Sequence, residues 1–519
     1  MPITKYLLII LFMLLGIVSF AQNRTITGKV LSTKDGTPVP GATVAVKGTN
    51  KAASSSPDGS FSIEAPNGRF TLVLSSVGFT NKEVTVNAGE NAVEINLSED
   101  SRQLNEVVVT ALGIARQSKT LVYATQTVKP KDLTEVRDAN NVINSLQGKI
   151  ANAVINQGSG GPGSGARIVL RGNRSLQGNN NALIVVDGVP YSNNTNGAGT
   201  SDFGSVQGSD GASNINPDDI ESVTVLRGAS AAALYGSQAG NGVIVITTKK
   251  GRKDRLAVTL NSGVAVESAF ALPRFQNQYG QGTGGVLDAT KGDSWGPKMT
   301  GQSYTNFLGQ PSSYSPQPDN VKDFFRNGTS LNNSLGITSG NDKMQTYLSY
   351  TNNLIQGIIP KNDLTRHTFN FRISNQISKR FSTDAKITYV NQDIKNRPRT
   401  GEENSPVSNI YNTARSISTA DASQYEVLNN IGIPTPTPFP STLSSIYQNA
   451  YWVINRTAIN ETRDRLVGFL TAKFKITDWL TLSGRANLDR TFDAGETKIS
   501  EGTILYSRSG GQYQKSNIT

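Results

Sequence analysis

The chain has 519 residues, and its 50 lysines and arginines outnumber its 39 acidic residues, which gives a formal net charge of +11. It contains no cysteine and one histidine, which excludes a disulfide framework, a thiolate nucleophile and a zinc site built on Cys or a His pair. That histidine, His367, lies in an alternating strand pattern that favours a structural role, and no Ser/His/Asp set stands out, so we expect neither an enzyme nor a bound cofactor.

The first 21 residues have the pattern of a secretory signal peptide. Lys5 precedes an apolar run over residues 7–20, and Ser19-Phe20-Ala21 provides a small-x-small cleavage site. The alternative is a membrane anchor, but the run is shorter than the roughly 20 residues that a spanning helix needs. We therefore expect cleavage after Ala21 and export of the chain.

Residues 24–98 predict a small all-β domain. Six or seven short stretches alternate apolar and polar residues, and turn signals such as Asp35-Gly36 and Asp58-Gly59 separate them, which indicates a β-sandwich. The segment resembles the carboxypeptidase-regulatory-like domain, and the resemblance implies a module without catalytic activity. The motifs that carry it are Gly28-Lys29-Val30, Pro40-Gly41-Ala42-Thr43-Val44 and Asp58-Gly59-Ser60-Phe61.

An isolated strand is expected within residues 104–114, with Glu106-Val107-Val108-Val109-Thr110 at its centre. Three consecutive valines followed by threonine favour a strand over a helix. The flanking segments are polar, and the strand has no obvious partner in its own chain. It is either a handle that adds itself to the sheet of another protein, or the last strand of the preceding domain, or a linker.

Residues 115–251 show a mixed α/β pattern, with short helical patterns at residues 131–133 and 139–148. The Gly-rich run at residues 158–165 lacks the Gly-Lys-Ser/Thr ending of a P-loop. Gly236, Gly240 and Gly242 precede a strand, which reverses the strand-turn-helix order of a dinucleotide site. We therefore do not expect nucleotide binding.

The same segment resembles the plug domain of TonB-dependent outer-membrane transporters, and more narrowly the SusC/RagA family of Bacteroidota. The matching motifs are Ile168-Val169-Leu170-Arg171-Gly172, Leu183-Ile184-Val185-Val186-Asp187-Gly188-Val189-Pro190, residues 215–236 and residues 240–248. The resemblance implies that Glu106, Val107, Val108, Val109 and Thr110 form the TonB box, which the family keeps just before the plug. This favours the handle over its two alternatives.

A plug must block a wide barrel and yet loosen when it is pulled. Polar contacts and water can yield where an apolar core would not, so Arg171, Asp187, Glu221 and Arg227 are expected to make charged contacts between plug and barrel wall. We interpret Arg171 and Arg227 as structural latches rather than substrate ligands. The alternative for each residue is a surface ion pair of small energetic value.

A dense basic cluster then ends the plug segment. We interpret it as a solvated linker, because a nucleic-acid-binding surface needs a basic face with aromatic residues or a known motif, and neither is present. Its members are Lys249, Lys250, Arg252, Lys253 and Arg255.

Residues 255–519 predict the start of a transmembrane antiparallel β-barrel. About eight segments alternate between an apolar face for lipid and a polar inner face, and short turns such as residues 378–380 and 477–479 join some of them. Trp479 suits an interfacial girdle. The connections at residues 268–327 and 392–465 are long and polar, as expected for extracellular loops and not for a water-soluble β-sandwich, which is the alternative. Plugged transporters use about 22 strands, so we expect an incomplete barrel and the N-terminal part of a longer chain.

The sequence therefore predicts a mainly β protein: a signal peptide, a β-sandwich, a TonB box, an α/β plug and part of a barrel in the outer membrane. The resemblance implies import of an oligosaccharide or peptide with energy relayed by TonB and its ExbB/ExbD partners. It also implies a SusD-like surface lipoprotein that covers the barrel. No nucleic acid is expected as a partner. The alternative is a surface adhesin or binding receptor built of β-sandwiches and without transport.

Overall fold

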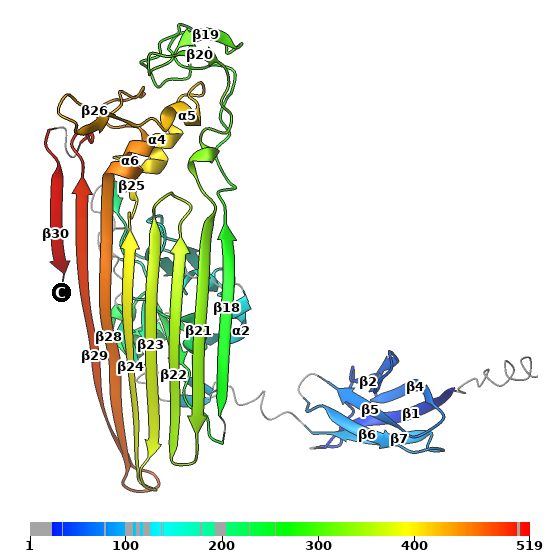
Figure 1. The fold of residues 1–519 in the computed structure, drawn as a ribbon. Coiled ribbons are helices and arrows are strands. Elements are labelled where there is room, and N and C mark those ends of the chain that lie inside the picture. Colours follow the sequence, from blue (N-terminus) through cyan, green and yellow to red (C-terminus); the bar gives the residue numbers. More distant parts are fainter. Residues whose placement is uncertain are drawn as a thin grey trace, which may run out of the picture. The chain divides into compact units, whose positions relative to one another are not determined.

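The computed structural model describes residues 23–518 apart from residues 34, 77–78, 99–106, 110–114, 118–124, 136–137, 139, 177–178, 192–203, 228, 255 and 506–508. The expected signal peptide, Glu106, Thr110 and Arg255 lie outside the described residues. The chain divides into two compact units, one of residues 1–108 and 116–121 and the other of residues 109–115 and 122–519. As expected, the fold is mainly β (Figure 1).

The first unit contains the expected β-sandwich, with a three-stranded sheet in the order β4-β1-β7 and a four-stranded sheet in the order β3-β2-β5-β6. Alternate residues of both sheets, such as Ile26, Ile63 and Leu72, point into one buried core, as the alternation of apolar and polar residues requires. The strands are β1 Asn23–Ser32, β2 Thr43–Val46, β3 Ala52–Ser54, β4 Ser60–Pro66, β5 Phe70–Ser75, β6 Lys82–Val86 and β7 Ala92–Leu97.

The three valines of the expected TonB box form a strand, β8 (Val107–Val109). The expectation that this strand lacks a partner in its own chain is wrong, because β8 pairs with β9 (Ala115–Gln117) in a two-stranded sheet. A sheet of two strands is at best marginally stable in water by itself.

The plug in the second unit is built on a five-stranded sheet in the order β10-β16-β17-β13-β14, with a separate hairpin of β11 and β12. Its elements are β10 Thr125–Val128, α2 Pro130–Glu135, η3 Asn144–Leu146, β11 Ala153–Asn156, β12 Arg167–Leu170, β13 Leu183–Val186, β14 Val189–Tyr191, η4 Pro217–Asp219, β16 Ile220–Leu226, α3 Ala229–Tyr235, η5 Ser237–Ala239 and β17 Val243–Thr248.

One expected plug helix is reduced to a single turn. Within the described residues 140–148, the structure has only the 3-10 turn η3, although Val142, Ile143 and Leu146 are buried as their spacing suggests. Asp138 Oδ1 accepts hydrogen bonds from the backbone N–H groups of Asn140 and Asn141, which favours a turn over a helix here. The sequence pattern therefore identified the buried face but not the conformation.

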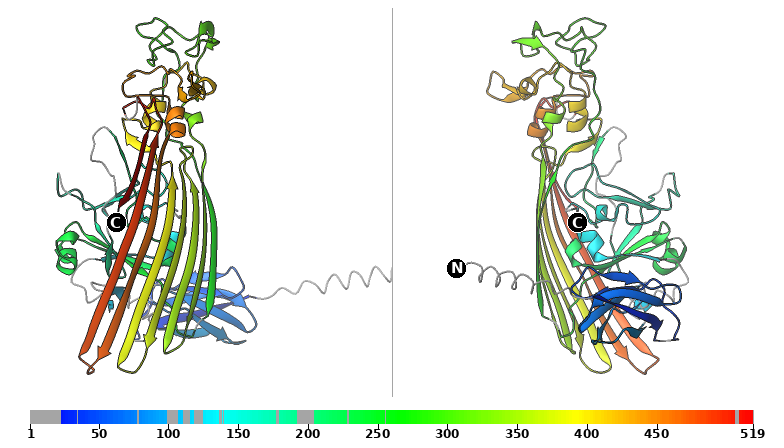
Figure 2. Two further views of the ribbon diagram at one scale, coloured as in Figure 1. Left: turned by 60° about the vertical axis from the view of Figure 1, so that its left-hand side comes forward. Right: turned by 90° about the vertical axis from the view of Figure 1, so that its right-hand side faces the viewer.

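The second unit also contains an open antiparallel sheet of eight strands, here called the wall sheet, with β18 and β30 at its edges (Figure 1). The plug lies against one face of this curved sheet (Figure 2). The strands in sheet order are β18 Ala257–Glu267, β21 Gly328–Gly340, β22 Met344–Gln356, β23 Asp363–Gln376, β24 Phe381–Lys395, β28 Thr457–Lys475, β29 Thr481–Ile499 and β30 Gln512–Ile518.

The wall sheet has the reverse polarity of a sheet in a water-soluble domain. Its outer face exposes large apolar side chains, including Leu260, Phe369, Ile387, Leu470 and Leu482. Its buried inner face is polar and includes Asn332, Asn353, Arg366, Asn370 and Gln392. A surface of this kind suits contact with lipid outside and a polar plug inside. In the described residues, no helix has the length and apolar character to cross a membrane.

Two long connections extend from the end of the wall sheet opposite the short turns (Figure 1). The expected loop at residues 392–465 is shorter than predicted, because β24 continues to Lys395 and β28 begins at Thr457. The outward-facing residues there are polar, such as Asn391 and Asp464, so both strands extend beyond the part that alternates apolar and polar residues. The first connection contains β19 Gln302–Thr305, β20 Pro311–Tyr314 and η6 Lys322–Phe324, and the second contains β25 Arg399–Gly401, α4 Pro406–Tyr411, α5 Thr419–Ala422, β26 Glu426–Leu428, β27 Pro434–Pro436 and α6 Ala450–Arg456.

Candidate functional site

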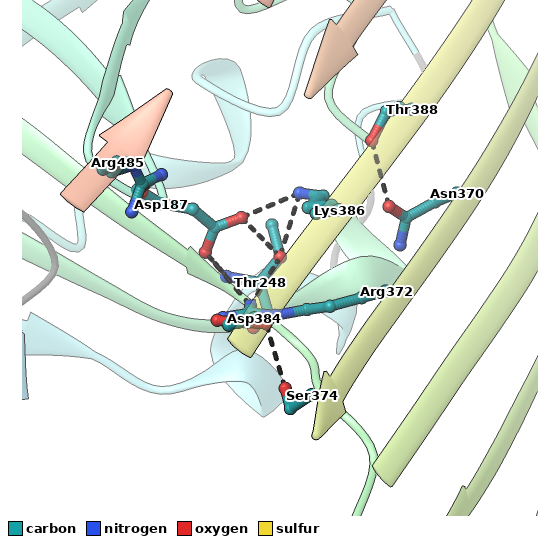
Figure 3. Close-up of polar contacts among 9 residues, drawn as sticks. All are labelled: Asp187, Thr248, Asn370, Arg372, Ser374, Asp384, Lys386, Thr388 and Arg485. Atoms are coloured by element: carbon teal, nitrogen blue, oxygen red, sulfur yellow. Dashed lines mark hydrogen bonds and ion pairs between the residues drawn. The ribbon is translucent and has the colours of Figure 1, made fainter. Parts of the chain in front are cut away.

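A buried group of charged side chains, here called the Asp187 cluster, joins the plug to the wall sheet (Figure 3). Asp187 lies in the tight turn between β13 and β14 with a positive φ of 48°, and Gly188 follows it. Asp-Gly is a preferred pair for two-residue hairpin turns. Its carboxylate accepts hydrogen bonds from the Thr248 backbone N–H at 2.9 Å and the Thr248 hydroxyl at 2.6 Å, so β17 fixes its direction.

The wall sheet supplies the cations of the Asp187 cluster. Lys386 Nζ lies 2.8 Å and Arg372 Nη1 3.5 Å from the Asp187 carboxylate. Arg372 and Lys386 are opposite each other on neighbouring strands, and like charges in such positions repel. Asp384 pairs with Arg372 at 2.7 Å, and Asp187 neutralises the remaining charge. The plug carboxylate therefore completes a group that the wall alone leaves with an excess positive charge.

Burial alone would raise the pKa of Asp187, but the Lys386 ammonium and the Arg372 guanidinium outweigh it and hold the pKa below its ordinary value. The carboxylate is therefore ionised at neutral pH. Arg485 of β29 also donates a hydrogen bond to the Asp187 backbone carbonyl. Three wall strands thus hold one turn of the plug.

A second contact region brings four arginines onto one plug segment, residues 207–214. Arg366, Arg463 and Arg465 lie in wall strands, and Arg397 lies in the connection that follows β24. Their guanidinium groups donate to backbone carbonyls: Arg366 to Ser213, Arg397 to Gln207 at 2.9 Å, Arg463 to Asp210 at 3.1 Å and Arg465 to Gly211 at 2.9 Å. Backbone carbonyls are neutral acceptors, so each contact can be exchanged for water without stranding a plug charge.

Three of these arginines have their own carboxylate partners on the wall. Arg463 pairs with Asp493 at 2.6 Å, Arg465 with Asp489 at 2.7 Å and Arg397 with Glu461 at 2.9 Å. The plug supplies none of these three carboxylates, so these arginine charges are compensated without it. The interface can therefore separate at a lower cost than one held only by ion pairs across it.

The four plug residues predicted as charged latches lie in different surroundings. The structure places Asp187 against the wall, as described above. Glu221 lies 3.8 Å from Arg252 and lines a cavity of about 180 Å³ between the plug and β18, β21 and β22. Arg171 is exposed with φ of 62°, and Arg227 donates to Gln126 of the neighbouring plug strand. The two arginines singled out as latches are thus not part of the Asp187 cluster.

The wall side of the interface was not predicted from the sequence. Arg372, Asp384 and Lys386 were visible only as polar members of the inner strand face. The spacing of two along each strand placed them on that face, but nothing in the sequence showed which plug residue they would meet.

The Gly-rich run at residues 158–165 also packs against the wall. A Cβ at Gly163 would lie 2.5 Å from Leu364 Cδ1 and 2.9 Å from Ile394 Cδ1, two buried apolar side chains on the inner face. Gly163 also has a positive φ of 71°. Glycine suits both the positive φ and the close approach to the wall at this position, so the run has a packing role at the plug–wall contact.

Gly163→Ala should loosen the plug more than Gly172→Ala. Both glycines have positive φ, so alanine is strained at each, but a Cβ at Gly172 meets nothing within 4 Å. The difference between the variants therefore isolates the wall contact. Limited proteolysis of the plug in native membranes measures it, and equal protease sensitivity of the two variants would contradict the contact.

In the described part of the chain, no group of three or more His, Asp or Glu side chains is placed to hold a metal ion.

Two family models match the sequence. The CarboxypepD_reg-like domain matches residues 26–109, and the TonB-dependent Receptor Plug Domain matches residues 117–243.

The curated relatives are receptors of one kind. TonB-dependent receptor P3 of Formosa agariphila is 27% identical over 99% of this chain and 49% of its own length. TonB-dependent receptor SusC of Bacteroides thetaiotaomicron is 32% identical over 73% of this chain and 35% of its own length. The chain thus spans about half or less of the relatives that it matches.

A solved structure of the RagAB peptide importer in its open-open state matches with a TM-score of 0.57 at 18% identity, over 79% of this chain and 45% of that chain. This likeness shows a shared fold. The chain therefore contains a CarboxypepD_reg-like domain and a TonB-dependent receptor plug domain, and it is similar in sequence to SusC and other TonB-dependent receptors.

Proposed function

We propose that the chain is the plug-bearing part of an outer-membrane transporter that imports a bulky nutrient, an oligosaccharide or a peptide, with energy relayed by TonB. The observation that carries this proposal is the polar plug interface on the inner face of a sheet whose outer face is apolar. Such an interface holds a plug in place and still permits its release. RagAB is described as a peptide importer, which supports the peptide alternative.

In this proposal, residues 1–21 are a signal peptide, residues 24–98 the sandwich domain, residues 104–114 the TonB-box segment, residues 115–251 the plug and residues 255–519 the first part of the barrel. The sheet has eight antiparallel strands, and its apolar face would contact outer-membrane lipid. The TonB-dependent receptors among the relatives support a transporter rather than an enzyme.

We infer that Glu106, Val107, Val108, Val109 and Thr110 bind TonB, which acts with ExbB and ExbD. Within the described residues, β8 pairs with β9 alone, so the sheet they form has edges that another strand can join. Strand addition uses main-chain hydrogen bonds and tolerates varied side chains, which suits a handle of this composition.

We further propose that a SusD-like surface lipoprotein covers the barrel mouth. The β26–β27 hairpin in the second long connection exposes Leu428 at 68% and Ile431 at 78%. An exposed apolar hairpin of this kind suits a protein interface.

The whole protein, isolated in mild detergent, should co-purify with the lipoprotein and a retained ligand, which mass spectrometry would identify together. Leu428→Ser with Ile431→Ser should lower recovery of the lipoprotein. Trp479→Ser is the matched control, because Trp479 is 83% exposed in a turn at the opposite end of the wall strands. Purification of the barrel alone under several mild conditions would contradict the lidded transporter, whereas TonB coupling would be tested separately.

A further inference from the structure

A strand of the plug pairs with a strand of the second long connection. β15 (Gly204–Val206) runs antiparallel to β25, and Ser205 lies opposite Thr400. The Thr400 hydroxyl donates to the Ser205 backbone carbonyl at 3.1 Å. This backbone pairing differs from the side-chain contacts of the Asp187 cluster, because it ties the plug to a connection rather than to a wall strand.

Arg397 fixes the start of this strand pair. Its guanidinium donates to the Gln207 carbonyl at 2.9 Å and the Ser209 hydroxyl at 3.1 Å, while Glu461 of β28 holds its charge at 2.9 Å. The base of the connection, the wall and the plug therefore meet at one buried side chain.

The pairing is also close. A Cβ added at Gly204 would lie 3.3 Å from the Thr400 carbonyl oxygen and 3.3 Å from Glu403. Gln207, just after β15, accepts a hydrogen bond from the Ser159 backbone N–H at 2.8 Å, which links the pair to the Gly-rich run. A shift of the connection would therefore be transmitted through β15 and Gln207 to the Gly-rich run, which packs on the wall.

We propose that β25 is an outer latch: the plug leaves the wall only after the connection at residues 396–456 releases β15. Binding events on that connection then control plug release from the outside, while TonB pulls on the box from the inside. This inference rests on the proposed function. A pair of three-residue strands is short enough to open when the connection moves.

The first test labels the latch directly. Ser205→Cys in the whole protein is treated with a membrane-impermeant maleimide on intact cells, with and without Thr400→Pro, which disturbs strand pairing. Labelling should become about tenfold faster with the proline, because the strand pair loses roughly one hydrogen bond and exposes the thiol more often. The control is Ser303→Pro in β19, which should leave the labelling rate unchanged. Equal rates in the Thr400→Pro and parent backgrounds would overturn the latch.

The second test locks the latch with a disulfide between Ser205→Cys and Thr400→Cys, in a chain without native cysteine. Uptake of a radiolabelled oligopeptide pool, or of a radiolabelled oligosaccharide pool in a parallel assay, should fall when the pair is oxidised and recover on reduction. The control pair is Ser303→Cys with Ser313→Cys, which are opposite each other in β19 and β20. Normal uptake by the locked protein would overturn the latch. Uptake that does not need TonB would instead contradict the proposed function, and the labelling test would still decide the latch.

Discussion

Val108→Pro should abolish energised uptake while the protein stays folded in the membrane and still binds its ligand at the surface. Proline has no backbone N–H and a fixed φ, so it removes a donor from the middle of β8 and prevents its addition to a TonB strand. Because β8 lies in a two-stranded pair outside the sandwich and plug sheets, the change should not disturb their cores. Site-specific crosslinking to TonB and whole-cell uptake measure the effect.

Val108→Thr is the matched control for this variant. Threonine is β-branched and keeps the backbone donor, so crosslinking and uptake should stay near the parent level. Normal TonB crosslinking and uptake in Val108→Pro would contradict the assignment of residues 106–110 as the TonB box. The predictions about the plug do not depend on this result.

Asp187→Asn should loosen the plug and make the barrel leak. The substitution leaves Lys386 facing Arg372 without the plug carboxylate, and removal of one partner from a buried ion pair costs about 3–5 kcal/mol. Entry of vancomycin, which the intact outer membrane excludes, reports the leak. Asp478→Asn is the control, because its ion pair with Lys475 is exposed and contributes little.

Charge restoration distinguishes this effect from simple misfolding. Asp187→Asn with Lys386→Gln removes the unpaired cation and should recover part of the barrier to vancomycin. A double variant that leaks more than Asp187→Asn would contradict the charge argument.

The lowered pKa of Asp187 also determines how plug docking depends on pH in the parent protein. The stabilisation of the docked plug by this carboxylate is fully present above the ordinary pKa of about 3.9, and it is lost as the pH falls through the lower pKa of the docked state.

Strand periodicity predicted most of the architecture. The alternation that puts Phe369 and Ile387 outside also puts Asn370 and Lys386 inside, because side chains of a strand alternate between two faces. Pairs such as Asp58-Gly59 favour tight turns, so they indicated where one sandwich strand ends and the next begins. These features depend on neighbours in sequence, which a single chain displays.

The pairing of distant residues could not be predicted in the same way. Asp187 was expected at the wall, but its partners Arg372 and Lys386 lie about 200 residues further on, and many other inward polar residues could have met it. The β15–β25 pair involves strands of three residues, too short for periodicity to reveal. The ends of β24 and β28 were not predicted either, because outward-facing residues next to the second long connection are polar and do not continue the alternation.

The most direct test of the central claim is uptake of the co-purified ligand by intact cells that carry the whole protein, with TonB present and with TonB deleted. The account predicts accumulation that requires TonB and the protonmotive force, together with unchanged surface binding of the ligand when TonB is absent. Accumulation at the same rate without TonB would contradict it.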